Sequence, residues 1–294
     1  MLILMVSISI LLMLLSILRM NNMAMKKILI LYFLAYLAMF FNTTDSYAQS
    51  PYNKSCTKDG LIFGSGIGFI ITSEILNSNI DTLTIFEINQ LSKNDINWFD
   101  RSAASNYSPA LSSVSGWIVG ACIISPLTLF LSKDIRDDAC TMTTMYLETL
   151  LLSTFVPRTL KSSGRIRPLI YNPDVPLEKK LELKKKARAS FPSGHTTSAF
   201  ATAVFFATVY SNYFPSFEWK PYIWSGALLT ASSVGYLRYA SGKHFPTDVL
   251  ASAVIGSAIG YFIPYLHKRK SSNNLSIQPI CQMEQFQIAV QFTF

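Results

Sequence analysis

The body of the chain contains six apolar stretches of helical length, separated by polar segments. They cover residues 61–76, 111–131, 142–156, 196–213, 221–237 and 249–266. The second, fourth and last stretches contain no Asp, Glu, Lys or Arg over at least 18 residues, which is long enough to cross a hydrocarbon layer of roughly 30 Å. Their Ser, Thr, Gly and Ala residues suit close packing in a membrane, but also the buried helices of a large soluble protein. The pattern therefore predicts an all-α protein built on a six-helix bundle, and we favour the membrane-embedded form.

The first 48 residues form a separate hydrophobic region. Met25 is followed by a basic pair, then by an apolar run over 28–41, and then by a small-x-small sequence that ends at Ala48. This order is typical of a secretory signal that is cleaved after that alanine. The apolar run over 1–18 has no place in such a signal. We therefore expect either a true start near Met25 or retention of both runs as membrane segments, and the first is the simpler interpretation.

Residues 49–270 are expected to form the helical domain, and residues 271–294 a polar tail. Apolar and polar residues alternate from Phe286 to Phe294, which predicts a β-strand at the end of that tail. One strand or hairpin cannot close a membrane barrel, so we expect a short appended β-like element.

The charge is concentrated in one polar segment. Lys and Arg number 25 against 17 Asp and Glu, and the net charge of +8 suits a phosphate ester or an anionic lipid as well as nucleic acid. Segment 158–190 holds ten of the basic residues and only three acidic ones. We expect its lysines at 179–180 and 184–186 to be solvated, the latter on a basic helix over 181–188, rather than to touch a substrate.

Titratable residues elsewhere give weaker indications. The four cysteines form no CxxC pair and have no spacing with His that is typical of zinc, so neither a zinc knuckle nor a disulfide scaffold is indicated. Glu74 and Glu148 lie inside apolar stretches. We interpret them as helix-packing or headgroup-level residues, although an ionisable group at membrane depth is also a candidate functional group.

A first basic motif, Lys161-Ser-Ser-Gly-Arg-Ile-Arg-Pro168, follows the third apolar stretch. Pro168 ends the local helix, and the guanidinium groups of Arg165 and Arg167 can bind phosphate oxygens in a bidentate manner. Alone the motif is a weak signal, because basic residues at a membrane edge usually contact headgroups or set topology.

A second motif, Pro192-Ser193-Gly194-His195, opens the fourth apolar stretch. Ser193 is placed as an N-cap, and the exposed amides of the first turn, with the positive end of the helix dipole, form an anion site. Gly194 lets the backbone approach a phosphoryl oxygen, and His195 can donate a proton to a leaving alkoxide. The alternative is a plain N-cap with an incidental histidine.

A third motif runs from Arg238 to Asp248 and links the last two apolar stretches. His244 and Asp248 are four residues apart, so they share one helix face, and the carboxylate can accept the imidazole Nδ1 proton and leave Nε2 as the nucleophile. A lone His-x-x-x-Asp pair is usually structural. However, the chain has only three histidines, and two of them fall inside motifs of the required chemistry.

Together the three motifs resemble the type 2 phosphatidic acid phosphatase superfamily, which includes lipid phosphate phosphatases, soluble bacterial acid phosphatases and vanadium haloperoxidases. The likeness covers roughly residues 140–266. It implies that His244 attacks phosphorus to form a phosphohistidine, that Asp248 orients it, and that His195 protonates the leaving group. It further implies that the phosphoryl oxygens are bound by Lys161, Arg167, Ser193, the Gly194 amide and Arg238, with no metal and no cofactor.

Two departures from the family pattern stand out. Leu160 occupies the place where the family has Lys, and Lys161 follows it, so Lys161 is a shifted phosphate contact with Arg165 as a possible substitute. Leu237 replaces the usual Ser before Arg238, which removes a hydroxyl and leaves the arginine. Neither departure touches the nucleophile, the acid or the orienting carboxylate.

The resemblance implies a metal-independent phosphatase acting on a lipid phosphate or diphosphate, such as phosphatidate, an isoprenyl diphosphate or a lipid A type substrate. The alternatives are a broad-specificity exported acid phosphatase and a lipid phosphotransferase, with a vanadate-dependent peroxidase and a helical scaffold protein less favoured. The expected partners are the phosphate ester and a membrane, not nucleic acid. We expect an exported protein of the bacterial cell envelope, membrane-bound with its site facing the periplasm, or alternatively soluble in the periplasm.

Overall fold

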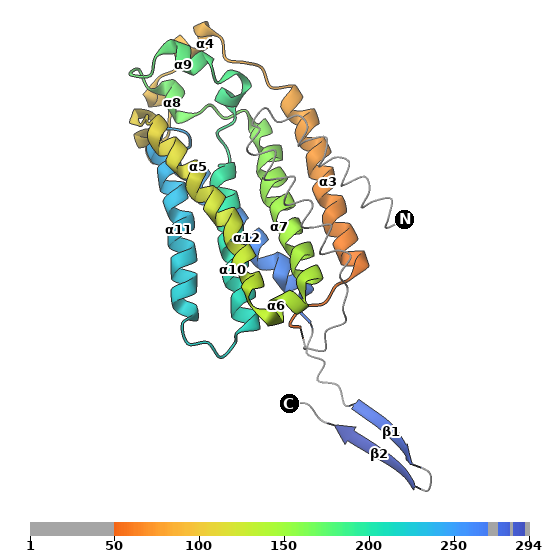
Figure 1. Cartoon of the computed structure of the whole chain (residues 1–294). Helices are drawn as coiled ribbons and strands as arrows, with labels where there is room; N and C mark the ends of the chain where they lie inside the picture. The colour runs from red at the N-terminus through yellow and green to blue at the C-terminus, as the bar shows by residue number, and fades with distance from the viewer. Residues whose placement is uncertain (1–49, 270–275, 283–284, 292–294) are drawn as a thin grey trace.

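A computed structural model describes residues 50–269, 276–282 and 285–291 of the chain (Figure 1). The expected signal region, with the start near Met25 and cleavage after Ala48, lies outside the described residues.

Six long helices run up and down beside one another and form a bundle (Figure 1). They are α3 (Cys56–Ser78), α5 (Pro109–Ile124), α7 (Ala139–Leu160), α10 (Gly194–Tyr213), α11 (Lys220–Ala240) and α12 (Pro246–His267). The 3-10 segment η3 (Ser125–Leu131) continues α5. Each of the six predicted stretches is thus covered by one helix, and the prediction of an all-α six-helix bundle is confirmed.

Helix α10 lies in the middle of the bundle and packs against α12, α11, α7 and α5. Its contact with α12 is especially close, because Gly256 and Gly260 of α12 face the α10 backbone. A Cβ atom on Gly256 would lie 2.3 Å from the Thr197 carbonyl oxygen, and one on Gly260 would lie 2.3 Å from the Ala201 carbonyl oxygen. Small residues at this spacing let two helix backbones approach directly. The first half of α10 is therefore held against the middle of α12.

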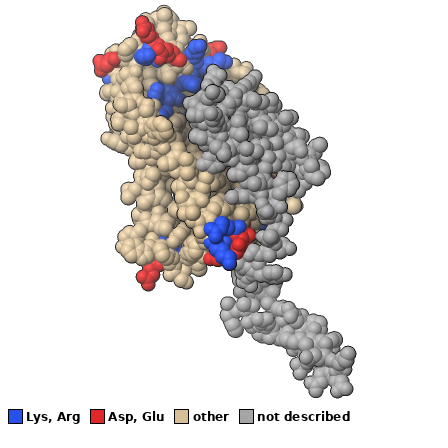
Figure 2. Space-filling model, viewed as in Figure 1, with Lys and Arg blue, Asp and Glu red and all other residues tan. Residues whose placement is uncertain are grey.

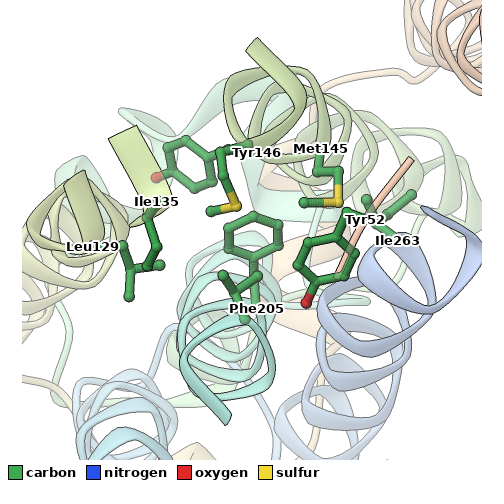
Figure 3. Close-up of a cluster of buried hydrophobic side chains, with 9 residues drawn as sticks. Tyr52, Leu129, Ile135, Met145, Tyr146, Phe205 and Ile263 are labelled. Carbon is green, nitrogen blue, oxygen red and sulfur yellow. The ribbon is translucent and has the colours of Figure 1, made fainter. Parts of the chain in front are cut away.

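The largest hydrophobic cluster lies between α7, α10 and α12 (Figure 3). Phe205 of α10 is fully buried at its centre, with its ring centroid 5.4 Å from that of Tyr146. Tyr52, which precedes α3, packs into the same cluster, and its hydroxyl accepts a hydrogen bond from Asn212 at 2.7 Å. The cluster ties the segment before α3 to the central helix.

Short helical segments gather at one end of the bundle, which is the upper end in Figure 1. They are α4 (Ile85–Gln90), η1 (Lys93–Asp95), η2 (Arg101–Ser105), η4 (Lys161–Ser163), α8 (Pro168–Tyr171), α9 (Leu177–Leu181) and η5 (Lys184–Arg188). One further short helix, α6 (Lys133–Asp137), lies at the other end. The basic helix expected over 181–188 does not form: α9 ends at Leu181, and only residues 184–188 are helical, as the 3-10 segment η5. The lysines at 184–186 are exposed as expected.

Three of the described helical segments are long and apolar enough to cross a membrane: residues 56–78, 109–131 and 246–267. Figure 2 shows charged side chains gathered toward the two ends of the described part of the bundle on this face, with a band of other residues between them. Helix α10, predicted as a third charge-free span, is not among these segments. Its Ser and Thr residues lower its hydropathy, and they are accommodated because neighbouring helices surround it.

The tail forms a two-stranded antiparallel hairpin of β1 (Ser276–Gln282) and β2 (Gln285–Gln291). Strand β2 covers most of the strand predicted from Phe286 onward, and Phe286 pairs with Cys281. Strand β1 was not predicted, because Pro279 interrupts its alternation and proline usually argues against a strand.

Candidate active site

His244 lies in the turn between α11 and α12 and is buried. Its Nδ1 is 2.7 Å from the carbonyl oxygen of Ser190, in the loop before α10. A carbonyl oxygen can only accept a hydrogen bond, so Nδ1 carries the proton and the lone pair is on Nε2. The backbone amide of His244 donates to the Arg238 carbonyl at 3.3 Å, which fixes the turn. The ring is therefore held in the tautomer that a nucleophilic Nε2 requires.

Asp248 does not make the direct hydrogen bond to His244 that the four-residue spacing suggested. Its Oδ2 is 3.7 Å from His244 Nδ1 and instead accepts hydrogen bonds from the Ser190 hydroxyl at 2.6 Å and the Phe245 amide at 2.9 Å. Ser190 thus contacts the imidazole through its carbonyl and the carboxylate through its hydroxyl. The aspartate acts on the ring through this residue and through its own negative charge.

Arg165, considered as a substitute phosphate ligand, is engaged elsewhere. One guanidinium nitrogen, NH1, donates to Asp248 Oδ1 at 2.5 Å, and the other, NH2, donates to Asp100 Oδ2 at 2.6 Å. The guanidinium also lies over the Phe245 ring, 4.3 Å from its centroid. This interpretation of Arg165 is therefore wrong, because its charge is paired with two buried carboxylates. The spacing of these residues along the chain does not predict either pair.

Asp100 is a component of the site that sequence reasoning missed. It is fully buried just before η2, and its carboxylate accepts hydrogen bonds from the Thr247 amide at 3.0 Å and the Thr247 hydroxyl at 2.7 Å, at the start of α12. Burial raises the pKa of Asp100, but the hydrogen bonds from Thr247, Asn97 and Arg165 outweigh it and lower that pKa overall. No motif marks this residue, because its partners lie far along the chain.

Arg167 and Lys161 are held by backbone carbonyl oxygens that line the loop before α10. Arg167 donates to the carbonyls of Lys186 at 2.8 Å and Ala189 at 3.3 Å, and to that of Lys243 at 3.4 Å. Lys161 donates to the carbonyls of Ala189 at 3.1 Å and Pro192 at 3.0 Å. Despite its shift of one residue, Lys161 reaches the same loop as Arg167.

Arg238, near the end of α11, is buried. Its NH1 donates to the hydroxyls of Ser112 at 3.2 Å and Ser115 at 3.3 Å on α5, a contact that no sequence motif indicated. Its Nε has no hydrogen-bond partner within the part of the chain that the structure describes. A buried guanidinium with a free N–H can bind an anion.

The Pro-Ser-Gly-His sequence forms the expected helix start. Ser193 is the N-cap of α10, and its hydroxyl oxygen accepts a hydrogen bond from the Thr196 hydroxyl at 2.8 Å. The Ser193 amide donates to Ser252 on α12 at 2.7 Å, so it is not free for a ligand. A Cβ on Gly194 would meet no atom within 4 Å, and the next residue, His195, is exposed. The first turn of α10 therefore opens on free space beside His195.

The electrostatics of these groups are dominated by positive charge. Burial, and then the neighbouring cations, lower the pKa of Lys161 to about 7 and that of Lys243 to about 8. Burial and the charges of Arg167, Arg238 and Lys161 hold the pKa of His244 well below its usual range. Partial loss of hydration and the same three cations also lower the pKa of His195, at the loop end of α10. Both imidazoles thus face one set of cations, and Asp248, the carboxylate that acts on Lys161 and Arg167, is itself paired with Arg165.

Residues 143–272 match the family model of the PAP2 superfamily. This part of the chain belongs to the PAP2 superfamily. The resemblance inferred from the three motifs is thereby confirmed, and all eight expected site residues lie within the PAP2 segment. Asp100, Ser112 and Ser115, which complete the arrangement, precede it.

Two curated relatives of the PAP2 segment come from Porphyromonas gingivalis. A lipid A 4'-phosphatase is 30% identical over 128 residues, which is 41% of this chain and 51% of that protein. A lipid A 1-phosphatase is 35% identical over 74 residues, which is 25% of this chain and 15% of that protein. The chain therefore spans about half the length of the first relative and much less of the second.

Two solved structures are also similar. A transmembrane PAP2-type phosphatidylglycerolphosphate phosphatase from Bacillus subtilis is 21% identical with a TM-score of 0.43, over 68% of this chain and 94% of that one. Aquifex aeolicus LpxE is 27% identical with a TM-score of 0.40, over 59% of this chain and 98% of that one.

Proposed function

We propose that this protein is a metal-independent phosphatase that hydrolyses a lipid phosphate through a phosphohistidine on His244. The observation that carries the proposal is a group of cations around a neutral, oriented imidazole: the buried Arg238 and the partly buried Lys161 and Arg167 act together on His244. Within the described residues, none of these three cations forms an ion pair with a carboxylate, and Asp248 is paired with Arg165. Removing several charges from water is costly unless an opposite charge compensates them. A phosphate dianion would supply that charge at the point where Nε2 can attack.

In the proposed binding mode, Lys161, Arg167 and Arg238 neutralise the phosphoryl oxygens. The Gly194 amide and the Ser193 hydroxyl add donors from the first turn of α10, where the helix dipole also favours an anion. Because backbone carbonyls already hold Lys161 and Arg167, the cations are fixed before the substrate arrives, which is the condition for electrostatic stabilisation of a transition state.

The proposed reaction has two steps. In the first, the lone pair of His244 Nε2 forms a bond to phosphorus while the ester P–O bond breaks, and His195 gives its proton to the leaving alkoxide. In the second, His195 takes a proton from water, the oxygen of that water bonds to phosphorus, and the P–N bond breaks to release inorganic phosphate. Asp248 stabilises the positive charge of the ring between the two steps.

The two histidines need opposite protonation states, and the substrate itself supplies the difference. Burial and nearby cations keep His244 neutral, as a nucleophile must be. The same cations also disfavour protonated His195 in the free enzyme. A bound phosphate dianion offsets these charges next to the exposed ring of His195 and favours its protonated, acid form.

We propose a lipid A type phosphate as the substrate, with phosphatidate and isoprenyl diphosphates as the other lipid candidates. Two observations support this choice: the site lies at one end of a bundle with membrane-length helices, and both curated relatives are named lipid A phosphatases. The test compares phosphate release by the detergent-purified full chain from lipid A, phosphatidate and p-nitrophenyl phosphate. Turnover of the water-soluble ester alone would instead indicate a broad-specificity acid phosphatase.

Two variants test the assigned roles. His244→Ala should abolish turnover and trapping of a labelled phosphohistidine, and label retained on histidine would refute the nucleophile. His195→Ala should slow alkyl phosphates far more than esters with good leaving groups, because only the former need a proton donor. Lys179→Ala is the matched control, since that lysine lies exposed in the same basic segment and pairs with Glu182 at 2.8 Å.

We further propose that the catalytic end of the bundle faces the periplasm of a bacterial cell envelope. In a six-span bundle this requires both N-terminal apolar runs, 1–18 and 28–41, to be retained as membrane segments, because cleavage after Ala48 would leave the opposite end, with Cys56, in the periplasm. Exposed Ser162 in η4 marks the catalytic end, whereas exposed Cys56 marks the other end. With all native cysteines replaced by Ser, Ser162→Cys should react with a membrane-impermeant maleimide in cells with a permeabilised outer membrane. A cysteine restored at position 56 should not react, and the reverse pattern would place the site in the cytosol.

A further inference from the structure

Three titratable side chains meet at the end of the bundle opposite the phosphatase site. Asp59 is in the first turn of α3, Glu148 is inside α7, and His267 is the last residue of α12. One ligand atom from each lies within 4.8 Å of the others. His267 and Glu148 are fully or almost fully buried, and Asp59 is partly buried. The proposed phosphatase chemistry uses none of them.

The tautomer of His267 makes this cluster unusual. Its Nδ1 is 2.9 Å from the Ile263 carbonyl oxygen, one helical turn earlier, so Nδ1 carries a proton. In the neutral ring, the Nε2 lone pair then points at two carboxylates, with Asp59 Oδ1 at 3.0 Å and Glu148 Oε2 at 3.5 Å. The imidazole nitrogen and the two carboxylate oxygens therefore point their lone pairs at one another, which is repulsive. A positively charged species between them would turn this repulsion into attraction.

Glu148 strengthens the argument. Both of its carboxylate oxygens are buried and make no hydrogen bond within the described part of the chain. A buried carboxylate without a partner is costly, and such groups are normally paired or bound to a metal. Lys54 acts on Glu148 through its charge, and its ammonium donates a hydrogen bond to the Cys140 sulfur at 2.7 Å.

We propose that Asp59, Glu148 and His267 bind one divalent transition-metal ion of the Zn²⁺ type. A tetrahedral Zn²⁺ with bonds of about 2.0–2.2 Å holds its ligand atoms about 3.3–3.6 Å apart. The observed separations of 3.0 and 3.5 Å from His267 Nε2 are close to this spacing. One imidazole nitrogen with two carboxylate oxygens suits Zn²⁺ better than Mg²⁺ or Ca²⁺, which prefer all-oxygen sites.

Two further features fit this ion. The hydrogen bond from Nδ1 to the Ile263 carbonyl is the outer contact that usually orients a metal-binding histidine. Two carboxylates and a dication sum to zero charge, so the buried cluster becomes neutral. The ion would link α3 to α7 and α12, which makes it a structural clamp far from the phosphate-binding residues.

The alternative species is a proton, which would convert His267 to a cation paired with the two carboxylates. Both species satisfy the lone pair, but they differ in measurable ways. A metal site responds to chelators and to added Zn²⁺ at constant pH, whereas a protonated triad responds only to pH.

The experiment measures bound metal in the full chain, purified in detergent through an affinity tag that lacks histidine. After exposure to ZnCl₂ and removal of excess metal, elemental analysis should find about one Zn²⁺ per wild-type chain. Glu148→Gln and His267→Gln should each weaken retention at least about tenfold. Glu74→Gln, which alters an exposed glutamate paired with Arg158, is the matched control and should retain the ion.

Thermal unfolding provides a second measurement that does not need the variants to fold. A strong chelator should lower the Tm of the wild-type chain at constant pH, and added ZnCl₂ should restore it. His244→Ala should bind the ion normally, which separates this site from the phosphatase mechanism. The proposal is overturned if wild-type chain retains no more metal than Glu148→Gln, or if its Tm depends on pH but not on chelator or ZnCl₂.

Discussion

Asp100 offers the sharpest test of how the active site is oriented, because it touches neither the phosphate-binding cations nor His244. The substitution Asp100→Asn keeps the size of the side chain and an oxygen for the Thr247 amide. It removes the negative charge that faces Arg165 across 2.6 Å. Arg165 in turn holds Asp248, which contacts His244 through Ser190, so the change reaches the nucleophile through Arg165, Asp248 and Ser190.

The size of the effect follows from that lost contact. A hydrogen bond between charged groups contributes about 1.5–3 kcal/mol. The Arg165 side chain is 28% exposed, so solvent screening reduces the expected value to about 1–2 kcal/mol. If the whole loss is felt in the transition state, kcat falls about 5- to 30-fold, since each 1.4 kcal/mol corresponds to about a factor of ten.

The assay measures kcat and KM for phosphate release, with a thermal melt of the same sample. We expect kcat to fall while KM stays within about twofold, because substrate binding by Lys161, Arg167 and Arg238 is untouched. A double-mutant cycle with Arg165→Lys should give less than additive losses, because both changes weaken one network. A lower Tm with an unchanged kcat would refute a positioning role for Asp100 and leave only a structural one.

The remaining predictions concern charge, pH and packing. Lys161→Ala should raise KM about tenfold or more in steady-state assays, and an unchanged KM would show that the shifted lysine does not bind phosphate. Burial and nearby cations lower the pKa of His244, so its neutral form persists to lower pH. The acid limb of a plot of kcat/KM against pH should therefore lie below about 6.5, the ordinary imidazole value. An acid limb at or above that value would contradict this assignment. Gly256→Ala places a Cβ 2.3 Å from the Thr197 carbonyl oxygen, so it should lower the free energy of unfolding, measured by denaturation, by about 1–3 kcal/mol. Gly226→Ala is the control and should be nearly neutral, because no atom lies within 4 Å of its Cβ. Equal effects of the two substitutions would argue against the close α10–α12 contact.

The sequence predicted well those features that depend on local pattern. Hydrophobic stretches of helical length located all six long helices, and the Ser193 N-cap followed from the residue type before the fourth stretch. Lys161 reaches the loop before α10 despite its shift of one residue, because its side chain is long, and its role as a phosphate ligand stays a prediction.

The features that the sequence did not predict depend on contacts between distant segments. Arg165 pairs with Asp100, 65 residues earlier, and no spacing rule connects them. The four-residue spacing of His244 and Asp248 predicted that the two side chains lie near each other, but they do not share a helix face, because His244 precedes the first residue of α12. Ser190 enters between them and contacts both side chains. The cluster of Asp59, Glu148 and His267 draws one residue from each of three helices, so it leaves no motif in the sequence.

The glycine contact between α10 and α12 has an evolutionary consequence for the proposed chemistry. The acid and the nucleophile stand at the starts of two helices whose backbones touch, while Lys161 and Arg167 come from the segment that joins α7 to α10. Insertions or substitutions in the connecting segments at that end can therefore reshape the recognition of a headgroup without altering the separation of the two imidazoles. A family built on this arrangement can diversify its substrates while its reaction stays the same.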